Sequence, residues 1–434
     1  MTRDIWGEAE AGTEGSVDMG EIDEPEDAAA RRVAPVRRPH SVLGQAPNPA
    51  LEIFVWSRLA LWGAALFALL WFEPNRHPDA ARWDTPALHD LGWAFDIWAR
   101  WDSAFYLRIA EGGYSGDAAA AFYPLYPALV ALGGRVLGGH YVLAGVVLSL
   151  AACLGAFLLL HRLAEAHLGA EGARRAVLYL ALFPTSVFLS AVYAESLFLL
   201  LVLGAFLLAE RRRFGGAGAV AGLALLTRPL GLALLPALAL IAIRSPARGR
   251  ALLGLCLAPL LFALYPVFLW LRLGDPLAFA GAQGVWTRSL SPLGPFGGVW
   301  DGLRAGWAGA RQLTAGADGR VYWEAGGEPM HTAAVNLSAL LFLVLFVALT
   351  VVAWRRFGAP YGVFCAASLA IPLSVPSERW PLLSLPRFGL VVFPFILALA
   401  ALGGRPRVHT AIAGTSALLL GVTVVQWALW QWVA

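Results

Sequence analysis

The sequence contains no lysine, so all 32 of its basic residues are arginine. Charge of either sign is scarce: 14% of the 434 residues are charged, whereas soluble domains have about 25%. The net charge of +3 is too small to indicate a nucleic-acid-binding protein. With 59% hydrophobic residues and a mean hydropathy of +0.64, the chain is predicted to be a membrane protein.

Metal-binding patterns are also missing. Cys153, Cys256 and Cys365 each lie in an apolar stretch, without the paired spacing of a disulfide framework or a zinc site. His161 and His167 are a poor match to metal-ligand spacing. There is no Asp-x-Asp pair, which a metal-chelated nucleotide-sugar would be expected to need. We therefore predict no metal site and no cofactor, and leave a divalent-metal requirement open.

Long apolar segments recur from residue 54 to residue 430, and we expect eleven of them to cross the membrane as helices. A further segment, 122–138, is short, contains two prolines and is interrupted by Arg135, so we expect it to lie on the membrane surface. The expected spans are 54–72, 141–161, 175–191, 193–209, 216–228, 229–243, 251–271, 332–354, 358–373, 388–403 and 408–430.

The arginine clusters predict which side of the membrane each loop faces. Residues 1–50 contain acidic residues from Asp4 to Asp27, then four arginines among prolines, with little that is apolar enough to pack. This composition predicts a disordered tail, and the arginines at 31–38 place it in the cytoplasm. The membrane domain is then 51–434, in a multi-pass protein of the cell membrane. Three long loops are left on the extracytoplasmic side, at 73–140, 272–331 and 374–387.

The first of these loops contains RWDSAFYLRIAEGGY at 100–114. Its apolar residues recur at helical spacing, which predicts an amphipathic helix at the membrane surface that ends at two glycines. Asp102 and Tyr106 would lie one turn apart on it. A partly desolvated carboxylate can act as the general base for a sugar hydroxyl, whereas a solvated acid on an interfacial helix would have no such role. The apolar positions are Trp98, Trp101, Phe105 and Ile109.

Four other polar residues lie near predicted span ends on the same side. Tyr193 and Glu195 occur where two spans adjoin, and an ionisable group there indicates either a functional site or an acid that reaches water. Arg228 and Arg387 belong to none of the cytoplasmic clusters. Guanidinium groups match phosphate oxygens, so the two arginines could bind a lipid phosphate; the alternative is that each reaches the interface from a helix end.

Six segments, in the expected order, resemble the GT-C glycosyltransferases, specifically the PIG-V type, which is the second mannosyltransferase of GPI-anchor assembly together with its bacterial relatives. The resemblance extends over most of the chain after residue 50. The segments are RWDSAFYLRIAEGGY at 100–114, FYPLYP at 122–127, FPTSVFLSAVYAESLF at 183–198, LTRPLG at 226–231, GDPLAFAGAQGVWTR at 274–288 and LPRFGLVVFPF at 385–395.

This resemblance implies an all-α GT-C fold whose outer loops carry juxtamembrane helices. It also implies a hexosyltransferase, specific for mannose, that uses a polyprenyl-phosphate sugar as donor and a lipid-linked or glycolipid acceptor on the extracytoplasmic face. Asp102 would be catalytic, and Arg228 and Arg387 would bind the donor phosphate. The acceptor or sugar would contact Trp101, Tyr106, Tyr193 and Glu195.

Three alternatives stay open. A transporter or flippase of lipid-linked sugars would also have many spans with arginine and glutamate inside them, although we find no paired halves of the transporter kind. A GT-C enzyme that moves arabinose or glucose would share the same motifs. A non-catalytic scaffold would use the outer loops to bind a partner. Membrane lipids are expected partners in every case, and the oligomeric state is not predicted.

Overall fold

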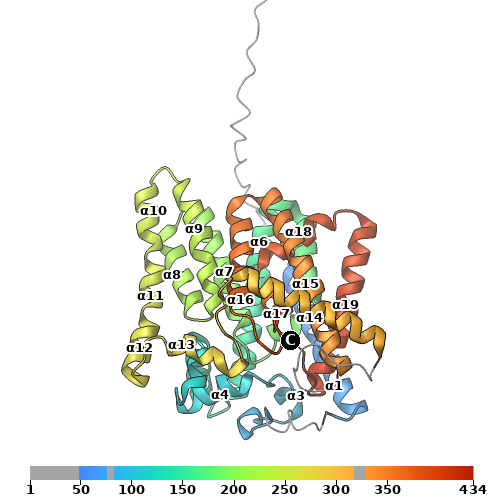
Figure 1. The fold of residues 1–434 in the computed structure, drawn as a ribbon. Helices are drawn as coiled ribbons and strands as arrows, with labels where there is room; N and C mark the ends of the chain where they lie inside the picture. Colours follow the sequence, from blue (N-terminus) through green and yellow to red (C-terminus); the bar gives the residue numbers. More distant parts are fainter. Residues whose placement is uncertain (1–47, 76–82, 317–328, 434) are drawn as a thin grey trace, which may run out of the picture. The chain divides into compact units, whose positions relative to one another are not determined.

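The computed structural model describes residues 48–75, 83–316 and 329–433, and the regular secondary structure of these residues is helical, with one isolated β-bridge between Arg288 and Ser377 (Figure 1). The predicted tail up to residue 47 lies outside the described residues, as do 76–82 and 317–328 in the predicted outer loops. The predicted class, an all-α polytopic membrane protein, is confirmed by the helices that follow.

Five stretches of helix are long and apolar enough to cross a membrane within the described part of the chain. The predicted count of eleven spans is not confirmed, because the other apolar helices have only 10–17 residues. The long stretches are α1 (Pro49–Trp71), α6 (Tyr141–Leu182), Arg248–Leu273, α15 (Pro329–Phe357) and α19 (Pro406–Ala428). The shorter helices are α5 (Leu125–Val136), α8 (Phe214–Leu225), Pro229–Ile243, α16 (Ala359–Ser374) and α18 (Phe393–Leu402).

Several of these stretches are built from shorter pieces. Residues Arg248–Leu273 comprise α10 (Arg248–Leu255), α11 (Leu257–Phe262) and α12 (Leu264–Leu273), and Pro229–Ile243 comprises η4 (Pro229–Ala233) and α9 (Leu234–Ile243). The span predicted at 388–403 is divided between α17 (Leu385–Leu390) and α18. Such breaks are tolerated at membrane depth where other parts of the protein cover the freed backbone groups.

The spans predicted at 141–161 and 175–191 form the single helix α6, which is interrupted at Gly169, where φ is 72°. The end predicted for the second span, residue 191, was wrong, because α6 stops at Leu182. Pro184 explains the stop: it disfavours helical geometry at Phe183, whose ψ is 137°. A 3-10 turn, η3 (Ser186–Leu189), then leads to α7 (Glu195–Glu210).

Arg58 of α1 forms hydrogen bonds to the segment that connects α6 to α7. Its side chain is buried and donates hydrogen bonds to the carbonyl oxygens of Ala181 and Ser186, at 3.2 and 3.1 Å. It also donates to the hydroxyls of Ser186 and Ser190. The carbonyls at the C-terminal end of a helix lack intrahelical donors and favour a nearby positive charge. The buried arginine thereby fixes the segment between α6 and α7.

The amphipathic helix predicted at 100–114 is shorter than expected. It is α4 (Ser103–Gly112), which exposes Arg108 and Glu111 and ends at Gly113. Trp101 has a left-handed φ of 52°, so Trp98 and Trp101 lie before the helix and do not share its face. Helical spacing alone could not predict this break, because it depends on the tertiary contacts described below.

Other elements of the predicted outer loops lie close to α4. Figure 1 shows α3 (Trp93–Asp96), α4 and α13 (Ala278–Gly281) at the same end of the helix bundle. The predicted surface segment 122–138 contains α5, which packs against α4 and α6. The helix α14 (Pro295–Ala315) packs its glycine-rich face against α15 and α16 and exposes Trp300 and Trp307 on the other, as expected of a juxtamembrane helix.

Candidate active site

Six of the seven predicted site residues line one cavity of about 290 Å³. Ligand sites usually measure roughly 300–1,000 Å³, so this cavity is at the lower end of that range. Its walls come from α4, the start of α7, η4, the segment around η5 (Ala282–Trp286), and α17. The six residues are Asp102, Tyr106, Tyr193, Glu195, Arg228 and Arg387.

Trp101 is the seventh predicted residue, and it does not line this cavity. Its side chain is 7% exposed, and its ring makes edge contacts with Trp430 and Trp432, each at 5.4 Å between centroids. A further contact joins it to Trp83 at 6.5 Å. The structure therefore gives Trp101 a packing role beside the site instead of a surface on which a sugar could stack.

Asp102 immediately precedes α4, yet its side chain forms no capping hydrogen bond to that helix. Its carboxylate accepts a hydrogen bond from Nη1 of Arg387 at 2.9 Å. Both side chains are largely buried, with 15% of Asp102 and 13% of Arg387 exposed. The start of a helix also favours negative charge. Asp102 thus lies at the wall of the cavity, paired with Arg387 and not used to cap the helix.

Glu195 joins the two predicted phosphate-binding arginines. It is the first residue of α7, it is 1% exposed, and Oε1 forms a close ion pair with Nη1 of Arg228. The same oxygen lies 3.5 Å from Nε of Arg387. Oε2 has no hydrogen-bond partner among the described residues. Asp102, Arg387, Glu195 and Arg228 therefore form one continuous chain of alternating charges along the cavity.

Arg288 is a cavity residue that the sequence-based site prediction missed. It is held by a hydrogen bond of 2.7 Å from Nη2 to the carbonyl oxygen of Leu383. Burial, together with the positive charge of Arg387, lowers the pKa of Arg288 to about 10, so its guanidinium is protonated at neutral pH. The sequence feature that could have identified Arg288 is its position at the end of the GVWTR motif.

The three guanidinium groups surround one aromatic ring. The central carbons of Arg228, Arg288 and Arg387 lie 5.5, 5.6 and 5.6 Å from the ring centroid of Phe388. Burial lowers the pKa of Arg387, but Asp102 and Glu195 outweigh this and raise it above its ordinary value. Three positive and two negative side chains line the cavity, so its lining carries a surplus of one positive charge.

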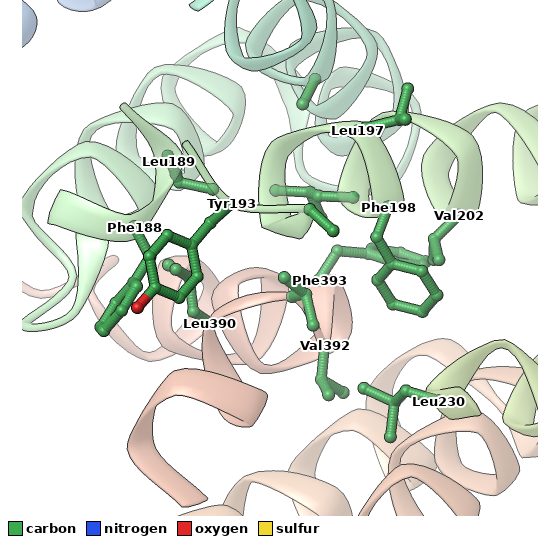
Figure 2. Close-up of a cluster of buried hydrophobic side chains, with 14 of the residues drawn as sticks. Phe188, Leu189, Tyr193, Leu197, Phe198, Val202, Leu230, Leu390, Val392 and Phe393 are labelled. Atoms are coloured by element: carbon green, nitrogen blue, oxygen red, sulfur yellow. The ribbon is translucent and has the colours of Figure 1, made fainter. Parts of the chain in front are cut away.

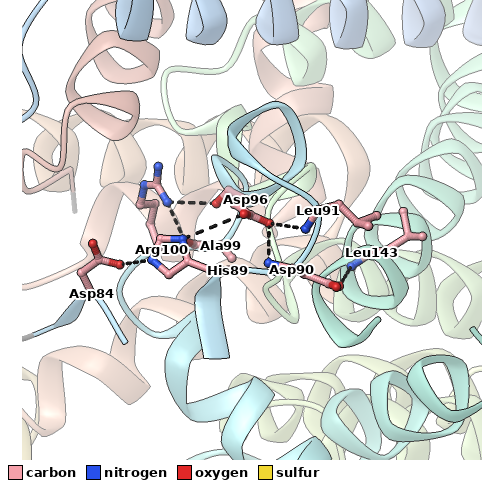
Figure 3. Close-up of polar contacts among 8 residues, drawn as sticks. All are labelled: Asp84, His89, Asp90, Leu91, Asp96, Ala99, Arg100 and Leu143. Atoms are coloured by element: carbon pink, nitrogen blue, oxygen red, sulfur yellow. Dashed lines mark hydrogen bonds and ion pairs between the residues drawn. The ribbon is translucent and has the colours of Figure 1, made fainter. Parts of the chain in front are cut away.

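The loop that leads to Asp102 is tied to the rest of the protein by polar contacts, which Figure 3 shows. The carboxylate of Asp96 accepts the backbone N–H groups of Asp90 and Leu91, and Asp90 accepts the N–H of Leu143 at the start of α6. Arg100 donates to the carbonyl oxygen of Asp96 at 2.9 Å. These bonds satisfy backbone groups that a loop would otherwise leave without partners.

Tyr193 lines the cavity and belongs to the buried cluster of Figure 2, where it packs beside Phe188 at 5.0 Å between ring centroids. Its hydroxyl donates to the carbonyl oxygen of Arg100 at 3.1 Å and accepts the N–H of Asp102, also at 3.1 Å. The side chain is 2% exposed. Tyr193 therefore bonds to the backbone on both sides of Trp101.

A second cavity, of about 580 Å³, lies between α4, α5 and α12. It is mainly apolar, and its only charged lining residues are Glu111 and Arg135. The smaller cavity contains the paired acids and arginines described above, so it is the candidate active site. No group of three or more His, Cys, Asp or Glu side chains within the described ranges is arranged to hold a metal ion.

Residues 91–237 match the family model for "Mannosyltransferase (PIG-V)". The predicted resemblance to this family is confirmed. The matched segment includes Asp102, Tyr193, Glu195 and Arg228, whereas Arg288 and Arg387 lie beyond it. The residues that carry the cavity's two carboxylates are therefore within the part of the chain that resembles mannosyltransferases.

Two solved structures are similar to this chain at low sequence identity. Archaeal oligosaccharyltransferase AglB from Archaeoglobus fulgidus, in complex with an inhibitory peptide and a dolichol-phosphate, is 14% identical, with a TM-score of 0.43. The alignment covers 87% of this chain and 56% of AglB. ArnT from Cupriavidus metallidurans, bound to undecaprenyl phosphate, is 16% identical with a TM-score of 0.38, over 88% of this chain and 78% of ArnT. No curated protein matches the sequence.

Proposed function

We propose that the protein is a membrane mannosyltransferase that transfers a hexose from a polyprenyl-phosphate sugar to a lipid-linked or glycolipid acceptor. It acts on the extracytoplasmic face of the cell membrane, with its N-terminus in the cytoplasm. The observation that carries this proposal is the cavity itself, in which Asp102 lies against Arg387 and beside two more buried guanidinium groups. The match to the PIG-V family supports mannose as the sugar.

The arginines suit a lipid-phosphate leaving group. Guanidinium groups bind phosphate oxygens through paired N–H donors, and they do so more strongly where water is excluded. A sugar phosphodiester carries one negative charge, which matches the single positive surplus of the side chains that line the cavity. Arg228, Arg288 and Arg387 would thus hold the donor phosphate before transfer and stabilise the second negative charge that develops on it.

The reaction requires a base for the acceptor. Asp102 takes the proton of the attacking hydroxyl, and the hydroxyl oxygen forms a bond to the anomeric carbon. The bond between that carbon and the phosphate oxygen breaks, and its electron pair stays on the lipid phosphate. Because attack and departure occur on opposite faces of the sugar, the anomeric configuration inverts. A general base of this kind contributes about 10²–10⁴-fold to the rate.

The test is a transfer assay with purified protein in detergent, labelled polyprenyl-phosphate mannose and a membrane lipid extract, followed by identification of the product. We expect mannose transfer by the wild type, a loss of at least about 100-fold in Asp102→Asn, and no loss in Glu111→Gln, which removes an exposed acid of the same helix. Normal transfer by folded Asp102→Asn protein would refute the mechanism. Transfer of arabinose or glucose would correct the sugar, and donor movement without transfer would indicate a transporter.

A further inference from the structure

Asp102 follows a strained backbone residue. Trp101 has φ of 52°, a left-handed conformation that is strained in a residue other than glycine and persists only where surrounding contacts enforce it. Without that turn, α4 would extend toward Trp98 and the Asp102 carboxylate would point elsewhere. The geometry of the candidate base therefore depends on whatever holds residues 100–102.

Tyr193 supplies two of those contacts with a single atom. Its hydroxyl accepts the N–H of Asp102 and donates to the carbonyl oxygen of Arg100, so it bridges the two peptide groups that flank Trp101. The N–H of Val192 donates to the carbonyl oxygen of Trp98 at 2.9 Å, which ties the same two chain segments together once more. The amide of Asp102 lies at a helix start, where no intrahelical acceptor exists.

The ring of Tyr193 contacts Arg387, which is the ion-pair partner of Asp102. The guanidinium carbon of Arg387 lies 5.6 Å from the ring centroid, within the range of a cation–π contact. The ring is itself fixed between Phe188 and Trp427, at 5.0 and 5.7 Å between centroids. One buried side chain thus contacts the backbone of Asp102 through its hydroxyl and the side chain of Arg387 through its face.

We propose that Tyr193 is a positioning residue that holds Asp102 and Arg387 in their relative geometry, instead of binding the acceptor or the sugar directly. This inference rests on the proposed function for its kinetic consequence. Tyr193 takes part in no proton transfer; it sets where the carboxylate meets the acceptor hydroxyl. Misplacement of a reacting group by about 1 Å can cost about 100-fold in rate.

Two variants separate the hydroxyl from the ring. Tyr193→Phe keeps the ring against Arg387 and loses both hydrogen bonds, so kcat should fall by about 10–100-fold while KM for the lipid-phosphate donor changes by less than about threefold. Tyr193→Leu loses both contacts, so kcat should fall and KM should rise. Tyr361→Phe is the matched control, because it removes a buried hydroxyl that contacts His167 and no residue of the site. Wild-type kcat in Tyr193→Phe would overturn the proposal.

Hydrogen–deuterium exchange tests the positioning role without any transfer assay. In the wild type, the Asp102 amide should be protected from exchange by the Tyr193 hydroxyl, and in Tyr193→Phe peptides covering 98–103 should exchange at least about tenfold faster while α7 is unchanged. An unprotected Asp102 amide in the wild type would refute the proposal even if the variant did not fold. If the wild type showed this protection but transferred no sugar, only the proposed function would fail.

Discussion

Arg387 donates a hydrogen bond of 2.9 Å from Nη1 to Oδ2 of Asp102, although 285 residues separate them in the chain. The candidate base and a candidate phosphate ligand are therefore bonded to each other. A donor phosphate that binds Arg387 would share the guanidinium with Asp102, so donor binding and base activation become linked. Glu195 lies against the other side of Arg387 at 3.5 Å and keeps it in place.

The Asp102–Arg387 pair predicts strongly non-additive effects on stability. Arg387→Gln leaves the carboxylate without its partner in a mostly buried position, so the free energy of unfolding should fall by roughly 2–4 kcal/mol. The double variant Asp102→Asn/Arg387→Gln should recover at least half of that loss, because no unpaired charge is left. Unfolding by SDS titration measures both values, with exposed Arg272→Gln as control. Additive losses would show that the pair is not coupled.

Glu195 is predicted to weaken anion binding while it organises the arginines. Glu195→Gln removes one of the two negative charges of the cavity, so the dissociation constant for undecaprenyl phosphate should fall by about tenfold. Turnover should fall as well, because Arg228 and Arg387 lose their shared partner. Calorimetric titration in detergent gives the constant, and Glu111→Gln is the control. Weaker binding in Glu195→Gln would assign the carboxylate to the ligand instead.

Arg288 tests whether the cavity binds phosphate beyond the residues predicted from sequence. Arg288→Gln should raise the dissociation constant for undecaprenyl phosphate by about 10–100-fold, because a charge-assisted hydrogen bond in a buried site is lost. Arg288→Lys should recover only part of this, since an ammonium group lacks the paired donors. The same titration measures both variants, and Arg272→Gln should bind as the wild type does. Unchanged affinity in Arg288→Gln would leave this residue with a structural role only.

Gly389 lies two residues after Arg387 and leaves no room for a side chain. A Cβ atom there would come within 2.0 Å of Cζ of Phe346, so Gly389→Ala should destabilise the protein by about 1–3 kcal/mol. Adding Phe346→Leu should return part of the loss. Gly414→Ala is the matched control, because nothing lies within 4 Å of its Cβ position. Unfolding of the three proteins by SDS titration measures these changes. An unchanged free energy of unfolding in Gly389→Ala would show that α17 can shift freely.

The sequence indicated most of the charged residues that line the cavity. Carboxylates and arginines are rare in the apolar part of a membrane chain, so Asp102, Glu195, Arg228 and Arg387 stood out without any structure. Arg288 did not, because an arginine in a long polar loop is ordinary until burial is known. Trp101 was predicted to contact the acceptor or sugar, but its contacts with Trp83, Trp430 and Trp432 involve distant parts of the chain and could not be predicted from the sequence around it.

Composition and apolar periodicity by themselves determined that this is an all-helical membrane protein with large loops, since a lipid environment requires every backbone group to be paired within a helix. Only the tertiary structure decided how long the helices are, because breaks at Gly169, Pro184 and Trp101 depend on local backbone geometry and on contacts made elsewhere. The tertiary structure also decided which charged residues pair with one another. Ion pairs such as Asp102 with Arg387 form between distant segments, and no local pattern in the sequence specifies them.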